Sequence, residues 1–130
     1  MRLKHFRLDI GAQIFLACAD RSRLRILNLI LHDSEMSITD LERVLDFTQS
    51  KTSRHLQYLR NSGMLSTRKI NQWTFYFIKD EVMDLVRIIL QFVEKDPELQ
   101  KDRQTFRILN TNRELPGLQI IARHEPTRHA

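Results

Sequence analysis

Hydrophobic residues recur three and four positions apart along most of this 130-residue chain, a spacing that predicts a mainly helical protein. Only three Gly and three Pro interrupt the chain, which favours helices with few long loops. The predicted helices cover residues 9–19, a second segment capped by Asp20 or Ser22, and residues 40–45, 49–61, 80–94 and 97–109.

Several helix ends carry residues that commonly begin or stop a helix. Thr39 and Glu42 have the spacing of a capping box, which predicts that a helix begins at Asp40. Thr48 can cap the following helix, and Gly63 supplies its left-handed stop. In the same way, Asp80 is expected to cap the fifth helix. Asp96 followed by proline is typical of the start of the sixth.

The hydrophobic period changes after Gly63. Residues 65–70 and 73–78 are both rich in β-formers, and only Asn71-Gln72 separates them, which predicts a β-hairpin. Its aromatic residues are interpreted as core packing. The two helices before it, 40–45 and 49–61, are short and joined by a tight turn, which is typical of a helix-turn-helix. The fold class is therefore mainly α with one β-hairpin.

Length and composition place the chain among globular proteins with one hydrophobic core. Hydrophobic residues make up 42% and charged residues 28%, and no apolar run approaches the ~18 residues of a membrane span. The single cysteine, Cys18, excludes an intrachain disulfide and favours a reducing cytoplasm. The basic start leads into no long apolar stretch, so no secretory signal is expected.

Charge is unevenly distributed along the chain. Residues 49–79 contain six basic residues and no Asp or Glu, whereas residues 80–100 contain six acidic residues against two basic ones. The net charge of +5 also suits a polyanion, but the segregation is more informative than the total. It predicts one surface that meets nucleic-acid phosphates and another kept away from them. The alternative is a chance fluctuation on a solvated surface.

The fourth helix is the candidate reader of base pairs, because a helix fits the major groove of DNA. Glutamine can pair with adenine and arginine with guanine. The predicted contacts on this helix are Gln49, Ser50, Lys51, Ser53, Arg54, His55 and Gln57. Further contacts, mainly to phosphate from the helix end and the hairpin, are predicted for Arg60, Arg68, Lys69, Asn71 and Gln72.

The first and fifth helices carry more apolar residues than one small core needs, which predicts a homodimer interface. The residues assigned to it are Ile10, Ile14, Phe15, Cys18, Leu85, Ile89, Leu90 and Val93. The alternative is that these residues belong to the core of a monomer. A dimer would place a second reading helix about one DNA turn away, so that the pair covers a palindromic operator.

Three stretches, Ala19–Leu27, Ser37–Leu41 and Ser53–Leu65, resemble the ArsR/SmtB family of bacterial repressors. The Ser-Arg-His-Leu run from Ser53, followed by Leu-Arg-x-x-Gly from Leu59, is the most specific part of this likeness. The resemblance covers roughly residues 10–93. It implies a winged helix-turn-helix with dimerising terminal helices, binding to a palindromic operator, repression, and release of DNA by a signal.

The chain departs from that family's metal sensors. The third helix, Asp40–Leu45, has no cysteine and the fifth, Asp80–Glu94, has no histidine, so no metal site and no cofactor are expected there. Cys18 is a candidate redox trigger, with an inert core thiol as the alternative reading. An organic ligand, a protein partner or constitutive binding all remain open as effectors, as do the operator, the regulated genes and activation in place of repression.

No motif of a known enzyme class is present, so the chain is interpreted as a binding protein and not an enzyme. The alternative function is a winged-helix protein-interaction module without specific DNA binding. A nonspecific chromosome-associated protein is a third reading. The predicted organisation is a DNA-binding and dimerisation domain over residues 1–95, an additional helix over 96–110, and a C-terminal tail of unassigned structure over 111–130.

Overall fold

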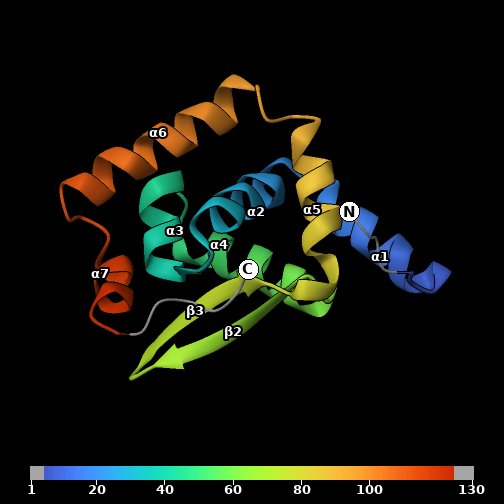
Figure 1. Ribbon diagram of the computed structural model, residues 1–130, viewed down its shortest axis with the longest axis horizontal. Coiled ribbons are helices and arrows are strands. Elements are labelled where there is room, and N and C mark those ends of the chain that lie inside the picture. Colours follow the sequence, from blue (N-terminus) through green and yellow to red (C-terminus); the bar gives the residue numbers. More distant parts are fainter. Residues whose placement is uncertain (1–4, 125–130) are drawn as a thin grey trace.

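The computed structural model describes residues 5–124 (Figure 1). The mainly helical fold with a small antiparallel sheet confirms the predicted fold class. Its elements are α1 (Leu8–Cys18), α2 (Arg21–Asp33), β1 (Met36–Ser37), α3 (Ile38–Leu45), α4 (Gln49–Asn61), β2 (Leu65–Ile70), β3 (Trp73–Ile78), α5 (Asp80–Gln91), α6 (Pro97–Thr111) and α7 (Pro116–Ala122).

Helix α2 lies at the centre of the described structure, among the other helices (Figure 1). Asp20 caps it by accepting a hydrogen bond from the Arg23 backbone N–H at 3.0 Å. Ile26 and Ile30 are fully buried, with Leu27 and Leu29 at 1% exposure. Because α2 is apolar over most of its circumference, it can be covered on several sides at once.

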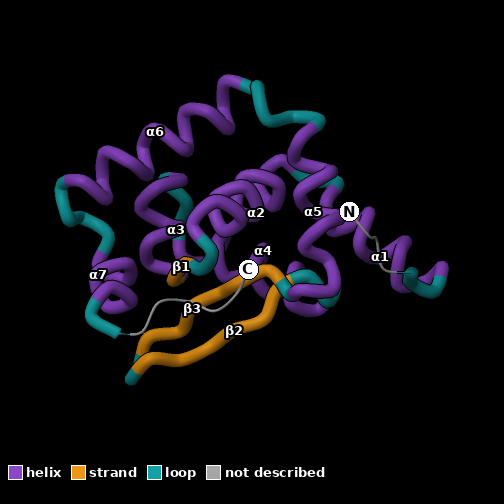
Figure 2. Tube along the Cα trace, in the orientation of Figure 1, coloured by secondary structure: helices purple, strands orange, loops and turns teal. Residues whose placement is uncertain are grey.

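The predicted hairpin is present with the predicted bounds, and it extends away from the helices (Figure 2). Leu65 pairs with Ile78 and Ile70 with Trp73, and Asn71 adopts a φ of 55° in the turn. Phe75 is fully buried, which confirms that the hairpin contributes to the core. The sheet order is β1-β3-β2.

Strand β1 lies outside every element that was predicted from the sequence. Met36 and Ser37 pair antiparallel with Tyr76 and Phe75 of β3. A strand of two residues is too short to show an alternating pattern. Its pairing depends on a partner 40 residues away (76 − 36), which no local pattern reveals.

Two predicted helix caps are wrong. Ser37 caps α3 by accepting from the Asp40 backbone N–H at 3.1 Å, so the helix begins at Ile38 and the capping box of Thr39 and Glu42 is not formed. Asp80 is the first residue of α5, and no side chain caps that helix. In both cases the residue that was assigned as the cap already lies within the helix.

At the end of α4, Gly63 has a φ of 80°, as the left-handed stop requires. The Met64 backbone N–H then donates to the Leu59 carbonyl at 3.0 Å, which turns the chain into β2. The α4 bounds, its Thr48 cap and this stop are all as predicted.

The segment after α5, called here the C-terminal extension (α6 and α7), folds back over α2 and α3 (Figure 1). The predicted cap of α6 by Asp96 is confirmed. The helix α7 was not predicted. Its Gly117 and Leu118 backbone N–H groups donate to the Asp40 carboxylate at 3.1 and 2.9 Å, and a Cβ on Gly117 would lie 2.4 Å from the Ser37 Oγ. Glycine is therefore required where α7 meets α3.

Candidate nucleic-acid interface

Helix α4 buries only one narrow side. The Thr48 hydroxyl accepts from the Lys51 backbone N–H at 3.2 Å, and the Thr48 carbonyl accepts from the Thr52 hydroxyl at 2.8 Å. These bonds fix the start of the helix, where anions bind most favourably. The side facing the core consists of Thr52, His55, Leu56 and Leu59.

The outer side of α4 is exposed, and here it is defined as Gln49, Ser50, Ser53, Arg54 and Gln57. The first turn of α4 carries no acidic residue, so its positive dipole end is not neutralised there. The Gln57 amide donates to the Asn61 side chain at 2.9 Å. No ion pair involves Arg54 or Arg60 within residues 5–124.

Lys51 is half-buried at the start of α4. Its ammonium lies 4.1 Å from the centre of the Phe47 ring, in the turn that joins α3 to α4. Asp46, also in this turn, adopts a left-handed conformation with a φ of 57°. The cation–π contact holds the lysine close to the outer side of the helix.

The structure places His55 in the packing between helices and not on the outer side. It is 8% exposed, and its Nδ1 lies 3.5 Å from the Arg23 guanidinium of α2. Burial lowers the pKa of His55, with the Arg23 charge acting in the same direction and Asp20 opposing it. Sequence reasoning assigned it to DNA contact because it flanks the reading positions.

Arg23 connects three helices. Its guanidinium donates to the α1 carbonyls of Ala17 at 2.7 Å and Leu16 at 3.3 Å, and it lies 4.0 Å from the centre of the Tyr58 ring of α4. The position of α4 is therefore tied to that of α2 and α1. Sequence reasoning did not single out this residue, because its contacts all come from other helices.

The hairpin tip carries three exposed polar residues, Lys69, Asn71 and Gln72, as a DNA-contacting wing requires. Arg68, the neighbour of Lys69, has a different role in the structure. Its Nε donates to both carboxylate oxygens of Glu35 at 2.9 Å, and Glu35 is 1% exposed. This ion pair attaches β2 to the segment before β1, so the expected phosphate contact of Arg68 is replaced by an internal bond.

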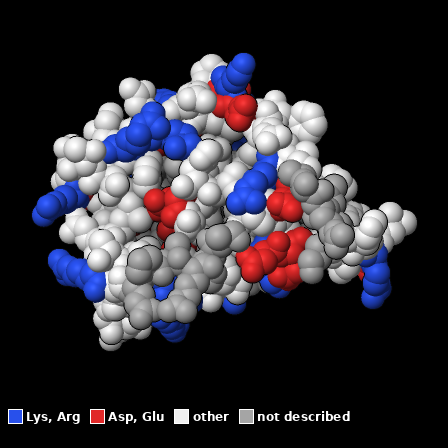
Figure 3. Space-filling view, in the orientation of Figure 1, with Lys and Arg blue, Asp and Glu red and all other residues white. Residues whose placement is uncertain are grey.

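The charges that surround this interface are arranged by region. In Figure 3, acidic side chains gather beside the start of α5, while basic ones follow α6. Asp80 and Glu81 lie in the first turn of α5, where acids favour the helix dipole.

The predicted dimer residues divide into two groups. Ile14, Cys18 and Leu90 are buried in the core of this chain, so their assignment to an intermolecular surface is wrong in this structure. Leu85 and Ile89 are half-buried, whereas Ile10, Phe15 and Val93 are exposed. Each helix turns one side to the core and another outward, so residues of the same helix fall into both the buried and the exposed group.

Of the exposed apolar residues that were missed, the three most exposed are Leu8, Leu16 and Phe92. Leu8 is 89% exposed, Leu16 59% and Phe92 83%. Leu16 and Phe92 each adjoin a predicted residue, so the doubled apolar positions 15–16 and 92–93 were the available signal. The apolar face is defined here as Leu8, Phe15 and Leu16 of α1 together with Phe92 and Val93, which directly follow α5.

Cys18 is a core thiol. It is 7% exposed, and its Sγ lies 3.9 Å from the Met64 sulfur. Burial raises its pKa to about 11, so the thiolate needed for oxidation or metal binding is scarce at neutral pH.

Within residues 5–124, no three His, Cys, Asp or Glu side chains gather as a metal site would require. No helix in the same range has the length and apolar character of a membrane span.

A short helix, a tight turn, an exposed second helix and an adjoining hairpin define the winged helix-turn-helix class of DNA-binding domains. The profile described as "Bacterial regulatory protein, arsR family" matches residues 20–67. The arsenic resistance transcriptional regulator ArsR1 of Pseudomonas putida is 36% identical over 90 residues, which cover 68% of this chain and 70% of ArsR1. The chain belongs to the arsR family of bacterial transcriptional regulators, which confirms the resemblance and the predicted class of function.

Two solved structures show the same fold. HlyU from Vibrio cholerae, which is named a transcriptional activator, superposes with a TM-score of 0.59 at 33% identity, over 65% of this chain and 91% of HlyU. The homodimeric winged helix-turn-helix DNA-binding domain of Mb0332 from Mycobacterium bovis superposes with a TM-score of 0.62 at 24% identity, over 68% of this chain and 82% of that domain.

Proposed function

We propose that this regulator binds a palindromic operator in double-stranded DNA as a homodimer, and that binding represses transcription. The observation that carries the proposal is the outer side of α4, which is exposed, polar and free of acidic residues within the described chain. It lies on a helix whose position is fixed by a cap, a core side and the Arg23 contacts.

We expect two kinds of DNA contact, one to base edges and one to phosphates. Base edges are read by Gln49, Ser50, Ser53 and Arg54, because glutamine and arginine form bidentate pairs with adenine and guanine. Gln57 lies further along the same side. Phosphates are met by Lys51, Arg60 and Lys69, with the amides of Asn71 and Gln72 at the hairpin tip. His55 and Arg68 position α4 and the wing.

The apolar face joins two copies of the chain. Its large side chains are exposed in a single chain, which is unfavourable in water and typical of an association surface. A dimer that reads two half-sites needs its two α4 helices about 34 Å apart, one turn of DNA. The homodimeric state stated for the Mb0332 domain supports this arrangement.

The signal that controls binding is not a metal or metalloid held by this chain's cysteine. Cys18 is buried and carries a raised pKa, whereas ligation requires an accessible thiolate. The relatives include regulators of arsenic resistance, but their inducer is not transferred here. We expect a binding protein without enzymatic activity.

Selection of bound duplexes from a random-sequence library tests the proposal. The expected product is a palindrome with half-sites about one turn apart, bound by two protomers in sedimentation analysis of the complex. Recovery of unrelated sequences, or binding of one protomer per duplex, contradicts it. In cells, the selected palindrome placed over a promoter should lower reporter expression. Increased expression would show that the protein activates, as the name of HlyU states for that relative.

A further inference from the structure

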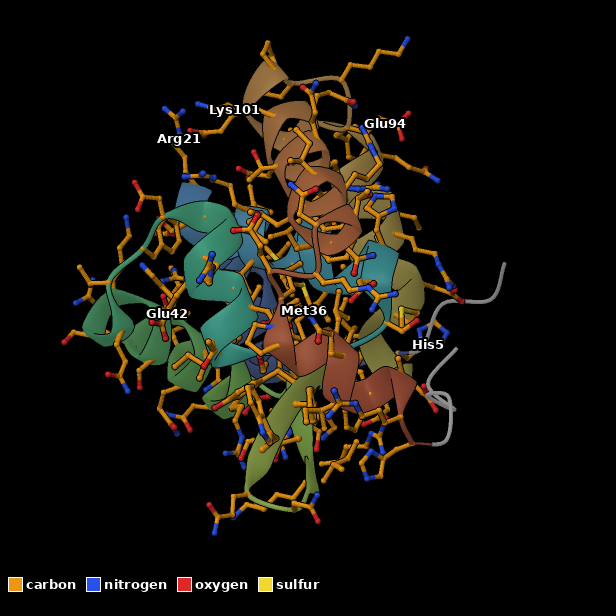
Figure 4. The ribbon with its side chains drawn as sticks, turned by 90° about the vertical axis from the view of Figure 1, so that its left-hand side faces the viewer. His5, Arg21, Met36, Glu42, Glu94 and Lys101 are labelled. Atoms are coloured by element: carbon orange, nitrogen blue, oxygen red, sulfur yellow. The ribbon has the colours of Figure 1, made fainter. Side chains whose placement is uncertain are left out.

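Two adjoining cavities lie where α2, α5 and the start of α6 meet. Their volumes are about 260 and 280 Å³, and both are lined by Asn28, His32 and Glu94. They are described here together as the α2–α5–α6 groove. Figure 4 shows Glu94 where α5 leads into α6, on the side of α6 opposite to Arg21 and Lys101. The groove is separate from the outer side of α4.

Asn28 has an unsatisfied polar atom at this site. The residue is 3% exposed, and its buried Nδ2 has no hydrogen-bond acceptor within the described chain. Burying an amide N–H without an acceptor is unfavourable, and most proteins avoid it. Because Asn28 lines both cavities, a ligand in the groove can provide the missing acceptor oxygen.

The charges around Asn28 favour an anion. Glu94 is the single carboxylate among the lining residues, against three basic side chains, Arg87, Lys95 and Arg103. Burial and the neighbouring Arg107 lower the pKa of Arg103, as expected for a cation whose charge is incompletely compensated. The pKa of His32 is lowered by burial and by Arg103, so it is neutral at pH 7.

The rest of the lining is apolar. Leu31 and Leu90 line one cavity and Leu99 the other. A ligand that is charged at one end and apolar at the other matches this combination. Small binding sites typically combine an apolar wall with a few convergent polar groups in this way.

We propose that the α2–α5–α6 groove binds a small amphipathic carboxylate, whose oxygen accepts from the Asn28 amide and whose charge meets Arg87 and Arg103. The apolar part of the ligand lies against Leu31, Leu90 and Leu99.

The groove is placed to influence DNA binding, a consequence that rests on the proposed function. Arg87 and Gln91 are four positions apart on one side of α5, and Glu94 lies in the turn that follows this helix. Phe92 of the apolar face begins the same turn, directly after Gln91. A ligand that links α2 to α5 therefore acts on the dimer contact, and through the Arg23 contacts of α2 it also acts on α4.

Calorimetric titration of the whole protein with octanoate, in the absence of DNA, tests the site. One octanoate per chain should bind saturably, and octanol, which lacks the charge, should bind at least tenfold more weakly. Arg87→Gln should weaken octanoate binding on the order of tenfold, because it removes a charged hydrogen-bond donor. The matched control Lys101→Gln changes an exposed basic residue of α6 that lies on the opposite side of that helix from Glu94, and it should leave binding unchanged.

The site is overturned by absence of saturable binding, by equal binding of octanol, or by unchanged binding in Arg87→Gln. Saturating octanoate should also change the affinity for the selected duplex at least fivefold, a typical size of allosteric coupling. Binding of octanoate without that change overturns the link to DNA. Failure of the protein to bind DNA without octanoate counts against the proposed function instead, so the two failures are distinguishable.

Discussion

The outer side of α4 and the C-terminal extension both carry charged side chains, but they differ in how these charges are paired within the chain. In the extension, Asp102 is 3% exposed and accepts from the Arg25 guanidinium at 2.8 and 2.9 Å. Glu114 likewise pairs with Arg43 at 3.2 Å. On α4, Arg54 pairs with no acid within the described residues. The paired charges hold the extension on α2 and α3, whereas the unpaired charge of Arg54 is available to a partner.

The largest effect is expected from breaking a matched pair. Asp102→Ala leaves the Arg25 guanidinium, whose side chain is 19% exposed, without its principal partner. The free energy of unfolding should fall by about 3 kcal/mol, measured by urea denaturation. As a control, Asp84→Ala removes an exposed pair with Arg87 and should cost at most ~0.5 kcal/mol. Equal effects of the two changes would refute the distinction between buried and exposed pairs.

Removing the unpaired charge of Arg54 should weaken DNA binding and leave the stability of the fold unchanged. Arg54→Ala should weaken binding to the selected duplex by about 2 kcal/mol, roughly thirtyfold, through loss of a bidentate base contact. Affinity for random duplexes should change much less, and the urea midpoint should stay the same. Arg107→Ala, an exposed arginine on α6, is the matched control and should leave DNA binding intact. A selectivity unchanged by Arg54→Ala would exclude Arg54 as a reader.

Asp33 differs from both the paired acids of the extension and the exposed Arg54. Its Oδ2 is buried and has no hydrogen-bond partner within the described chain. Burial raises its pKa from an ordinary 3.8 to about 7, with Asp40 and Glu35 acting in the same direction and Arg103 opposing them. Well below pH 3.8 the group is protonated whether the chain is folded or not. As pH rises towards 7 the unfolded chain loses this proton first, so the folded state is progressively destabilised.

Asp33→Asn removes this penalty. The variant should be more stable than the natural chain by on the order of 1 kcal/mol at pH 8, and about equally stable near pH 3. Urea denaturation at the two pH values measures the difference. A gain of the same size at both pH values would show that the effect does not come from titration of Asp33.

The smallest effect is expected at Lys69, the exposed neighbour of the paired Arg68. Lys69→Ala should weaken binding a few-fold on the selected and random duplexes alike, because a phosphate contact carries no sequence information. The slope of log affinity against log salt should decrease in magnitude by about 0.9. Fluorescence anisotropy at several salt concentrations provides both quantities. A loss confined to the selected duplex would instead assign Lys69 to base contact.

Local patterns were sufficient to predict α4, its Thr48 cap, its Gly63 stop and the hairpin, because each depends on residues close in sequence. They did not reveal β1 or α7, which are defined by contacts with distant residues. Asp40 illustrates the limit: as an acid near the start of a helix it looks exposed, yet it is fully buried and binds the start of α7.

The candidate site shows the same division. Exposure of the reading positions on α4 follows from helical spacing, so five of the seven predicted residues lie exposed on its outer side, Gln49, Ser50, Ser53, Arg54 and Gln57. Of the other two, Lys51 is half-buried against Phe47 and His55 is buried beside Arg23. In the hairpin, Arg68 is paired with Glu35, which approaches from another element. The apolar positions of α1 and α5 were recognised, but their division between core and outer surface requires the packed structure.

Fluorescence anisotropy of the natural protein, on the selected duplex and on a random duplex at two salt concentrations, tests sequence-specific recognition most directly. The account predicts at least ~10³-fold tighter binding to the selected duplex, and this preference should persist when added salt weakens both complexes. Equal affinity for the two duplexes, with both lost in salt, would contradict it.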